Sequence, residues 1–158
     1  MKGILKKYWY LLMVVGIVAF LLILNHVCQT SAHKKISLED VEKAYIYDVE
    51  MGSKHPIEGE ELEELIEMLN DVSGVKREYD SSPGTMGHSL GIVLKNGENL
   101  TMYPMGGKRW YVQVSGREWN WMDKLCAENG IKDAVMYIGT QEELHPWYDE
   151  KLELYNIE

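Results

Sequence analysis

Residues 90–104, "LGIVLKNGENLTMYP", decide the fold because they carry the strongest type of short-range hairpin signal. The pair Asn96-Gly97 separates two runs of β-prone residues. Asn-Gly accepts the positive φ angles of a tight turn, so the pattern predicts a β-hairpin and therefore antiparallel pairing. Residues 109–116, "RWYVQVSG", predict a third strand of the same meander, with Trp110, Val112 and Val114 on one face.

The segments on either side of the meander predict the rest of the sheet. Residues 44–49, "AYIYDV", place Tyr45 and Tyr47 on one face and Ile46 on the other, as alternation in a strand requires. Residues 75–80 and 132–139 predict two more strands. Residues 53–59, "SKHPIEG", are predicted to form a turn, because proline and glycine interrupt regular structure.

Helices are predicted between these strands. Residues 60–71 carry an apolar stripe at helical spacing, with glutamates on the opposite side. Residues 117–130 predict a second helix, and the tail after residue 140 predicts one or two helical turns. The expected fold class is α+β: an N-terminal transmembrane helix, then a small antiparallel sheet with two or more helices packed on one face.

The N-terminal segment is apolar and uncharged from residue 8 to residue 24. About 20 apolar residues span the hydrocarbon core of a bilayer, so we expect a transmembrane helix at about residues 8–27. Lys2, Lys6 and Lys7 precede it, which predicts a cytoplasmic N-terminus. The chain then divides into residues 1–35, the anchor and its stem, and residues 36–158, an extracytoplasmic domain.

The fate of this segment has three alternatives. An uncleaved signal anchor is favoured, because the apolar run exceeds the 7–15 residues usual in signal peptides. Cleavage near Ala32, with Thr30 two positions earlier, would instead release a secreted domain. A lipoprotein leader ending at Cys28 is disfavoured by the Asn-His-Val sequence that precedes this cysteine.

The remainder of the chain is acidic. All 25 Asp and Glu residues follow residue 33, whereas three of the 16 Lys and Arg residues precede it. Nucleic acid is excluded as an expected partner, because phosphate binding requires clustered cations. The same charge predicts that the domain stands away from an anionic bilayer on the polar stem of residues 28–35.

Residues 87–91, Gly-His-Ser-Leu-Gly, match the G-x-S-x-G pattern of serine hydrolases. That chemistry needs Ser89 on a tight turn between a buried strand and a helix. Residues before Gly87 are rich in glycine, proline and serine, and those after Gly91 enter the hairpin, so both flanks are wrong. A hydrolase is therefore the least favoured function, and the protein is not expected to be an enzyme.

No cofactor or metal is expected. His55, His88 and His145 lack metal-ligand spacing, and no C-x-x-C occurs. With one cysteine in the domain, Cys126 is interpreted as a small buried hydrophobic residue. A disulfide between Cys28 and Cys126, or between chains, is the alternative.

The aromatic residues are the remaining functional signal. Tyrosine and tryptophan combine an apolar body with a polar tip and are common at binding surfaces. Most are expected in the core, and the others define a candidate surface for a partner or a glycan. The candidates are Trp110, Trp119, Trp121 and Trp147.

The order of elements over residues 36 to about 128 resembles small membrane-anchored extracytoplasmic domains of unknown function from Gram-positive bacteria. The resemblance comes from the anchor, the "YIYD" strand, the "EELEELIEMLN" helix and the meander, "GIVLKNGENLTMYP" with "GGKRWYVQV". It carries no motif and implies no catalytic residues.

Two functions are therefore compared. The first is a non-catalytic, membrane-anchored protein-interaction, sensor or inhibitor module, whose partner is an envelope protein. The second is a glycan- or cell-wall-binding module, which requires at least two aromatic rings exposed on one surface.

Overall fold

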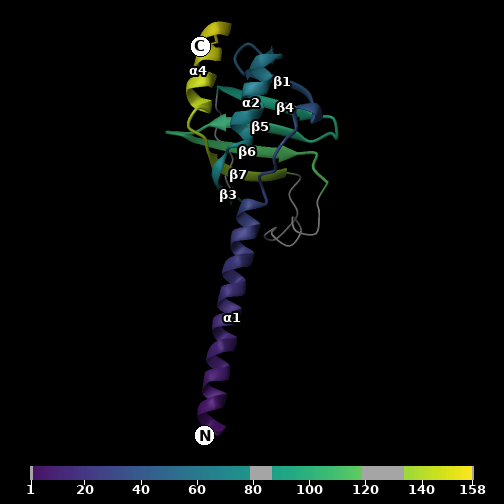
Figure 1. Cartoon of the computed structure of the whole chain (residues 1–158). Helices are drawn as coiled ribbons and strands as arrows, with labels where there is room; N and C mark the ends of the chain where they lie inside the picture. Colours follow the sequence, from purple (N-terminus) through teal and green to yellow (C-terminus); the bar gives the residue numbers. More distant parts are fainter. Residues whose placement is uncertain (1, 79–86, 119–133, 158) are drawn as a thin grey trace.

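The computed structural model describes residues 2–78, 87–118 and 134–157. A long helix, α1 (Lys2–Thr30), leads into a compact α+β body (Figure 1). Its segment Tyr8–Thr30 is long and apolar enough to cross a membrane, and none of its most apolar window is buried in the protein. The expected N-terminal apolar helix is therefore confirmed.

Within the described residues, seven strands form one antiparallel sheet in the order β2-β1-β4-β5-β6-β7-β3. Strands β1, β4, β5 and β6 correspond to strands expected from residue alternation, and they occupy the centre of the sheet. The strands are β1 (Val41–Asp48), β2 (Ser53–Ile57), β3 (Ser73–Glu78), β4 (His88–Leu94), β5 (Asn99–Pro104), β6 (Arg109–Ser115) and β7 (Ala134–Thr140).

The predicted hairpin joins β4 to β5. The amide of Gly97 donates to the carbonyl of Leu94 at 2.9 Å, and the Leu94 amide donates to Glu98 at 2.8 Å. Gly97 has a φ of 88°, a left-handed conformation that glycine adopts without steric cost. The Asn-Gly signal therefore gives the expected antiparallel pairing, with Leu90 opposite Met102.

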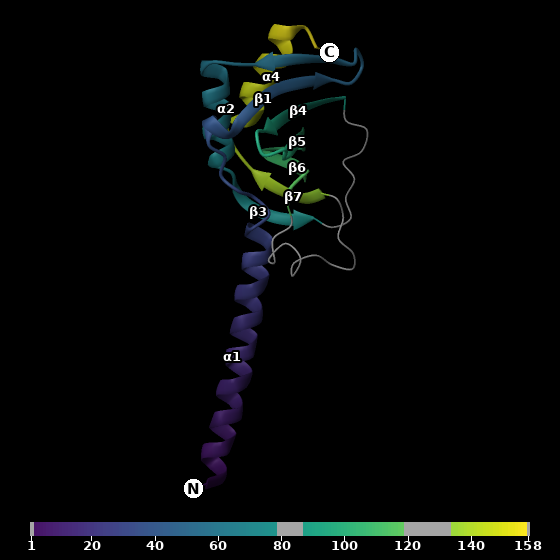
Figure 2. The ribbon, with the colours of Figure 1, turned by 90° about the vertical axis from the view of Figure 1, so that its right-hand side faces the viewer.

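Two helices, α2 (Glu60–Asn70) and α4 (Leu144–Tyr155), lie on the same side of the sheet (Figures 1 and 2). They cover one row of side chains that stand opposite one another across five strands. All members of this row are at most 2% exposed, so the row forms the centre of the core. Its members are Ile46, Leu90, Met102, Val112 and Tyr137.

Residues 53–57 are a strand rather than the predicted turn. Pro56 lies in β2 opposite Tyr45 of β1, and β2 is the edge of the sheet. Proline lacks an amide donor and is tolerated in an edge strand, where one side of the backbone needs no partner. The prediction was wrong because the sequence did not indicate which strand would be at the edge.

The stem packs against the body, and both Ala32 and Ile36 are buried. Asn70, the last residue of α2, accepts from the Ile36 amide at 2.7 Å and donates to its carbonyl at 2.8 Å. The body therefore sits directly on the end of α1, as Figure 2 shows. The helix expected at residues 117–130 lies almost entirely outside the described residues.

Candidate functional site

The G-x-S-x-G segment lies in the sheet. Ser89 is the second residue of β4, pairs with Tyr47 of β1, and is only 4% exposed. A nucleophile elbow instead requires a serine raised on a turn between a strand and a helix. Ser89 therefore does not have the geometry of that motif.

The four candidate tryptophans do not form one surface. Trp110 is 1% exposed and packs between His145 and Tyr148, with ring centroids 4.6 and 5.3 Å away. Its assignment to a partner surface was wrong, because it lies on the face of β6 that the helices cover. Trp119 and Trp121 lie outside the described residues, which leaves Trp147 of α4 as the candidate to consider.

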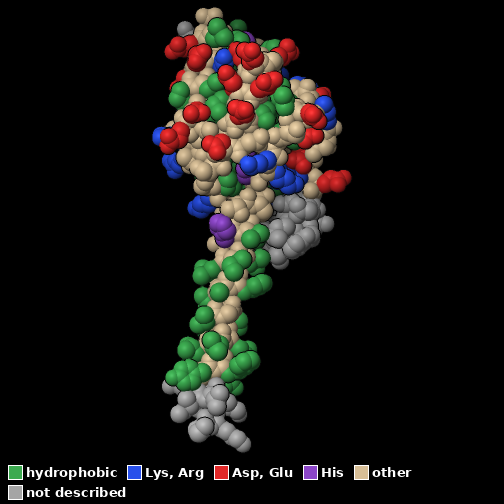
Figure 3. Space-filling model, viewed as in Figure 1, with side chains coloured by type: hydrophobic (Ala, Val, Ile, Leu, Met, Phe, Trp, Pro, Cys, Tyr) green, Lys and Arg blue, Asp and Glu red, His purple; other side chains and the backbone are tan. Residues whose placement is uncertain are grey.

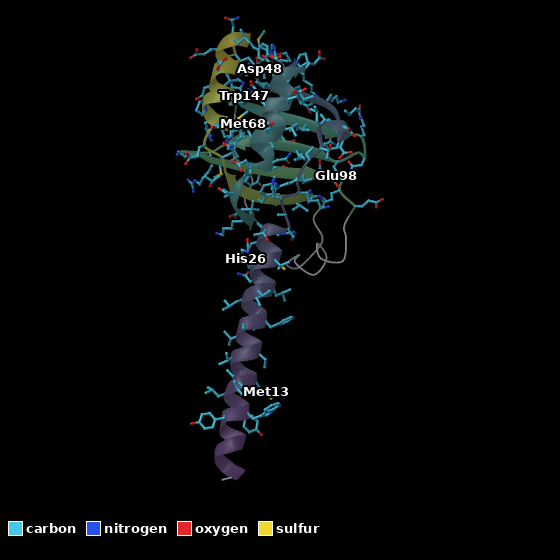
Figure 4. All side chains as sticks on the ribbon, viewed as in Figure 1. Met13, His26, Asp48, Met68, Glu98 and Trp147 are labelled. Carbon is cyan, nitrogen blue, oxygen red and sulfur yellow. The ribbon has the colours of Figure 1, made fainter. Side chains whose placement is uncertain are left out.

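A groove runs between α2 and the start of α4. It has a volume of about 520 Å³. Figure 4 labels Met68 and Trp147, which lie close to each other on these two helices. Its lining combines these two apolar side chains with four carboxylates and one amide. The polar lining residues are Glu64, Glu67, Asp71, Gln141 and Glu143.

The amphipathic pattern of α2 explains this arrangement. Leu65 and Leu69 are buried against the sheet, so Glu64, Glu67 and Asp71 must face away from the core. Acidic side chains gather over this side of the body in Figure 3. Like charges three or four residues apart on a helix destabilise it by a few tenths of a kcal/mol per pair. Packing against the core therefore keeps α2 folded despite this repulsion. Its acidic face favours a cationic neighbour.

Trp147 is fixed by contacts from both helices. Its indole N–H donates to the Glu64 carboxylate at 3.2 Å. The ammonium of Lys151 lies 5.6 Å from the centroid of the indole ring and donates to Glu61 at 2.7 Å. This hydrogen bond to Glu61 raises the pKa of Lys151 above its ordinary value. The ring is therefore held in place and already accommodates a cation within the fold.

The start of α4 extends the groove. The Gln141 side chain accepts from the amides of Glu143 at 2.6 Å and Leu144 at 3.3 Å, so it satisfies two backbone donors where the helix begins. A second cavity, of about 280 Å³, shares Asp71, Gln141 and Glu143 with the first. The two cavities therefore make one extended acidic groove, which we call the α2–α4 groove.

The α2–α4 groove offers hydrogen-bond acceptors, negative charge and an aromatic ring. Neither cavity has a lysine or arginine among its described lining residues. The described part of the chain also has no group of three or more His, Cys, Asp or Glu side chains arranged to hold a metal ion. Spread along a groove, these carboxylates suit an extended cationic segment.

The junction of α1 with the body is a second polar cluster. Arg77 of β3 donates to the Cys28 carbonyl at 3.1 Å, and Arg117 donates to the Ala32 carbonyl at 3.0 Å. Arg117 also pairs with Glu98 at 3.1 Å, and the side chains of this pair are 4% and 13% exposed. The sequence contains no pattern that indicates this junction, because Arg77 and Arg117 lie far apart in the chain and neither belongs to a recognisable motif.

Cys28 is disulfide-bonded. The chain contains one other cysteine, Cys126, which lies outside the described residues. This bond favours the interpretation that the sequence analysis kept as the alternative to a buried free thiol.

No family model, curated protein or solved structure matches this chain. Its functional interpretation therefore depends on the chain's own geometry.

Proposed function

We propose that the protein is a single-pass membrane protein that displays a non-catalytic interaction domain outside the cell. The α2–α4 groove is its binding site, and the partner is an envelope protein that presents a cationic segment. The observation that carries this proposal is the groove itself, where an aromatic ring and four carboxylates line one cavity without a lysine or arginine among the described lining residues.

Two features support the orientation. Three lysines precede the apolar segment, and cytoplasmic flanks of membrane helices are enriched in such cations. Cys28, at the opposite end of α1, is disulfide-bonded, and disulfides persist in oxidising compartments such as the cell exterior.

Cysteine labelling tests the orientation. In intact cells, Cys28 is expected to react with a membrane-impermeant maleimide only after reduction with a membrane-impermeant phosphine. The matched control is a Lys2→Cys variant in a Cys28→Ser, Cys126→Ser background, which should be labelled only after permeabilisation. If Cys28 needs permeabilisation as well, the proposed orientation is wrong.

Charge reversal tests the groove. The full chain in detergent should bind a fluorescent ten-residue peptide of alternating lysine and glycine, and Glu67→Lys should weaken binding by about tenfold, the effect of one charge contact of about 1.4 kcal/mol. The variant should stay folded, because it places opposite charges side by side on α2. Fluorescence anisotropy at low and high salt measures both affinity and its electrostatic share.

The matched control is Glu50→Lys, which changes net charge equally at an exposed residue beyond β1. It should leave the affinity within about twofold of the wild-type value, since exposed charges outside the contact are screened. Equal weakening by both variants would mean that the peptide responds to net charge alone. Trp147→Ala should also weaken binding in the proposed site, by removing the ring that lines it.

A further inference from the structure

Residues on or next to three strands hold the junction between α1 and the body. Arg77 of β3 donates to the Ser31 hydroxyl at 3.3 Å in addition to the Cys28 carbonyl, and its own amide donates to the Gln29 side chain at 2.7 Å. Arg117 follows β6, and Tyr137 belongs to β7. The membrane helix and the sheet therefore form one continuous unit as long as these contacts persist.

His33 lies within this junction. Its Nδ1 atom is 2.8 Å from the Tyr137 hydroxyl, and the two rings meet edge to face with centroids 5.6 Å apart. Its Nε2 atom is buried and has no hydrogen-bond partner among the described residues. The neutral imidazole can accept from Tyr137 at Nδ1, whereas an imidazolium has two donors and a charge to satisfy.

The groups that face His33 do not favour that charge. Arg117 and Lys35 repel a positive imidazole, and Tyr137 offers a neutral hydroxyl whose pKa burial raises further. The Glu98 carboxylate of the junction is already bonded to Arg117. Among the residues that the structure describes, the other charged groups of the junction and its adjoining cavity are Lys34, Asp40 and Arg77.

We propose that His33 is a pH-sensitive latch, whose protonation releases residues 31–36 from the sheet. The attachment of the body to α1 then changes from rigid to flexible. The consequence is that acidification outside the cell changes how the α2–α4 groove is oriented over the membrane.

The direction follows from linkage. Burial, followed by the charges of Arg117 and Lys35, lowers the pKa of His33 below its ordinary value of 6.5. The released segment takes up a proton near pH 6.5, whereas the docked segment does so only at lower pH. Docking is therefore fully stabilised above pH 6.5 and weakens as the pH falls through the lowered pKa.

Hydrogen exchange of the full chain in nanodiscs tests the latch. The Ile36 amide reports docking directly, because it donates to Asn70. After correction for intrinsic exchange, its protection should fall between pH 7.5 and pH 5.0, because the released segment takes up a proton more readily than the docked segment does. His33→Gln should abolish this dependence, and His55→Gln, in the β2 edge strand, should retain it.

Constant protection in the wild-type chain, or an unchanged loss in His33→Gln, would overturn the proposal. An NMR titration of carbon-13-labelled histidines gives an answer even if His33→Gln misfolds. A His33 pKa below 6.5 in the wild-type chain is expected, and a value at or above 6.5 refutes the latch.

Discussion

Replacing Arg117 with methionine is expected to lower the free energy of unfolding by about 3 kcal/mol, the lower end of the cost of breaking a buried ion pair. The substitution leaves the Glu98 carboxylate unpaired and the buried Ala32 carbonyl without its Arg117 donor. The lower end applies because Glu98 keeps some access to water. Chemical unfolding of the full chain in detergent, followed by circular dichroism at pH 7.5, measures the change.

The control is Lys43→Met, which removes an exposed ion pair with Glu42 at 3.9 Å. Exposed pairs contribute less than about 1 kcal/mol, so this variant should unfold almost as the wild type does. A double variant, Arg117→Met with Glu98→Gln, should recover part of the loss, because no unpaired charge remains. If Arg117→Met and Lys43→Met lose the same free energy, the buried pair does not stabilise the junction.

Local signals made the centre of the sheet predictable. The Asn96-Gly97 turn and the alternation in β1 and β6 are properties of short segments, so they can be recognised without knowing the rest of the fold. The apolar stripe of α2 is equally local, and it correctly predicted which side of that helix meets the core.

The features that the sequence did not reveal depend on tertiary position. In the sequence alone, Pro56 indicates a turn. It is compatible with a strand only because β2 lies at an edge of the sheet. Arg77 and Arg117 are 40 residues apart and become one junction only when β3 and the end of β6 come close to the stem.

Only part of the candidate site could be predicted, because the rest also depends on tertiary position. The glutamates of α2 were correctly placed on the side away from the core. Trp147, predicted as a possible surface aromatic residue, is partly buried against the core, and its role at a surface stays a prediction. Their meeting in one groove depends on how α4 packs beside α2, which no short segment determines. Trp110 was selected for the same reason as Trp147, as a tryptophan outside the anchor. It faces the core because the register of β6 places it there.

Gly116→Ala is expected to destabilise the protein by about 3 kcal/mol, more than the same change at another left-handed glycine. Gly116 has a φ of 73°, and a Cβ atom there would lie 2.4 Å from the Gly97 carbonyl oxygen. The left-handed conformation costs an alanine about 1–2 kcal/mol, and displacing the neighbouring backbone adds about 1–3 kcal/mol. Unfolding in denaturant, compared with the wild-type chain, measures the sum.

Gly107→Ala separates these two costs. Gly107 has a φ of 80°, but nothing lies within 4 Å of the Cβ atom that alanine would add. Its variant should therefore lose only the conformational term of about 1–2 kcal/mol. Gly116 also precedes Arg117, so the backbone shift that relieves the clash with Gly97 should displace the guanidinium from Ala32 and reduce protection of the Ile36 amide. Equal losses in both variants, with Ile36 protection unchanged, would mean that the hairpin turn and the junction of α1 with the body are not mechanically connected.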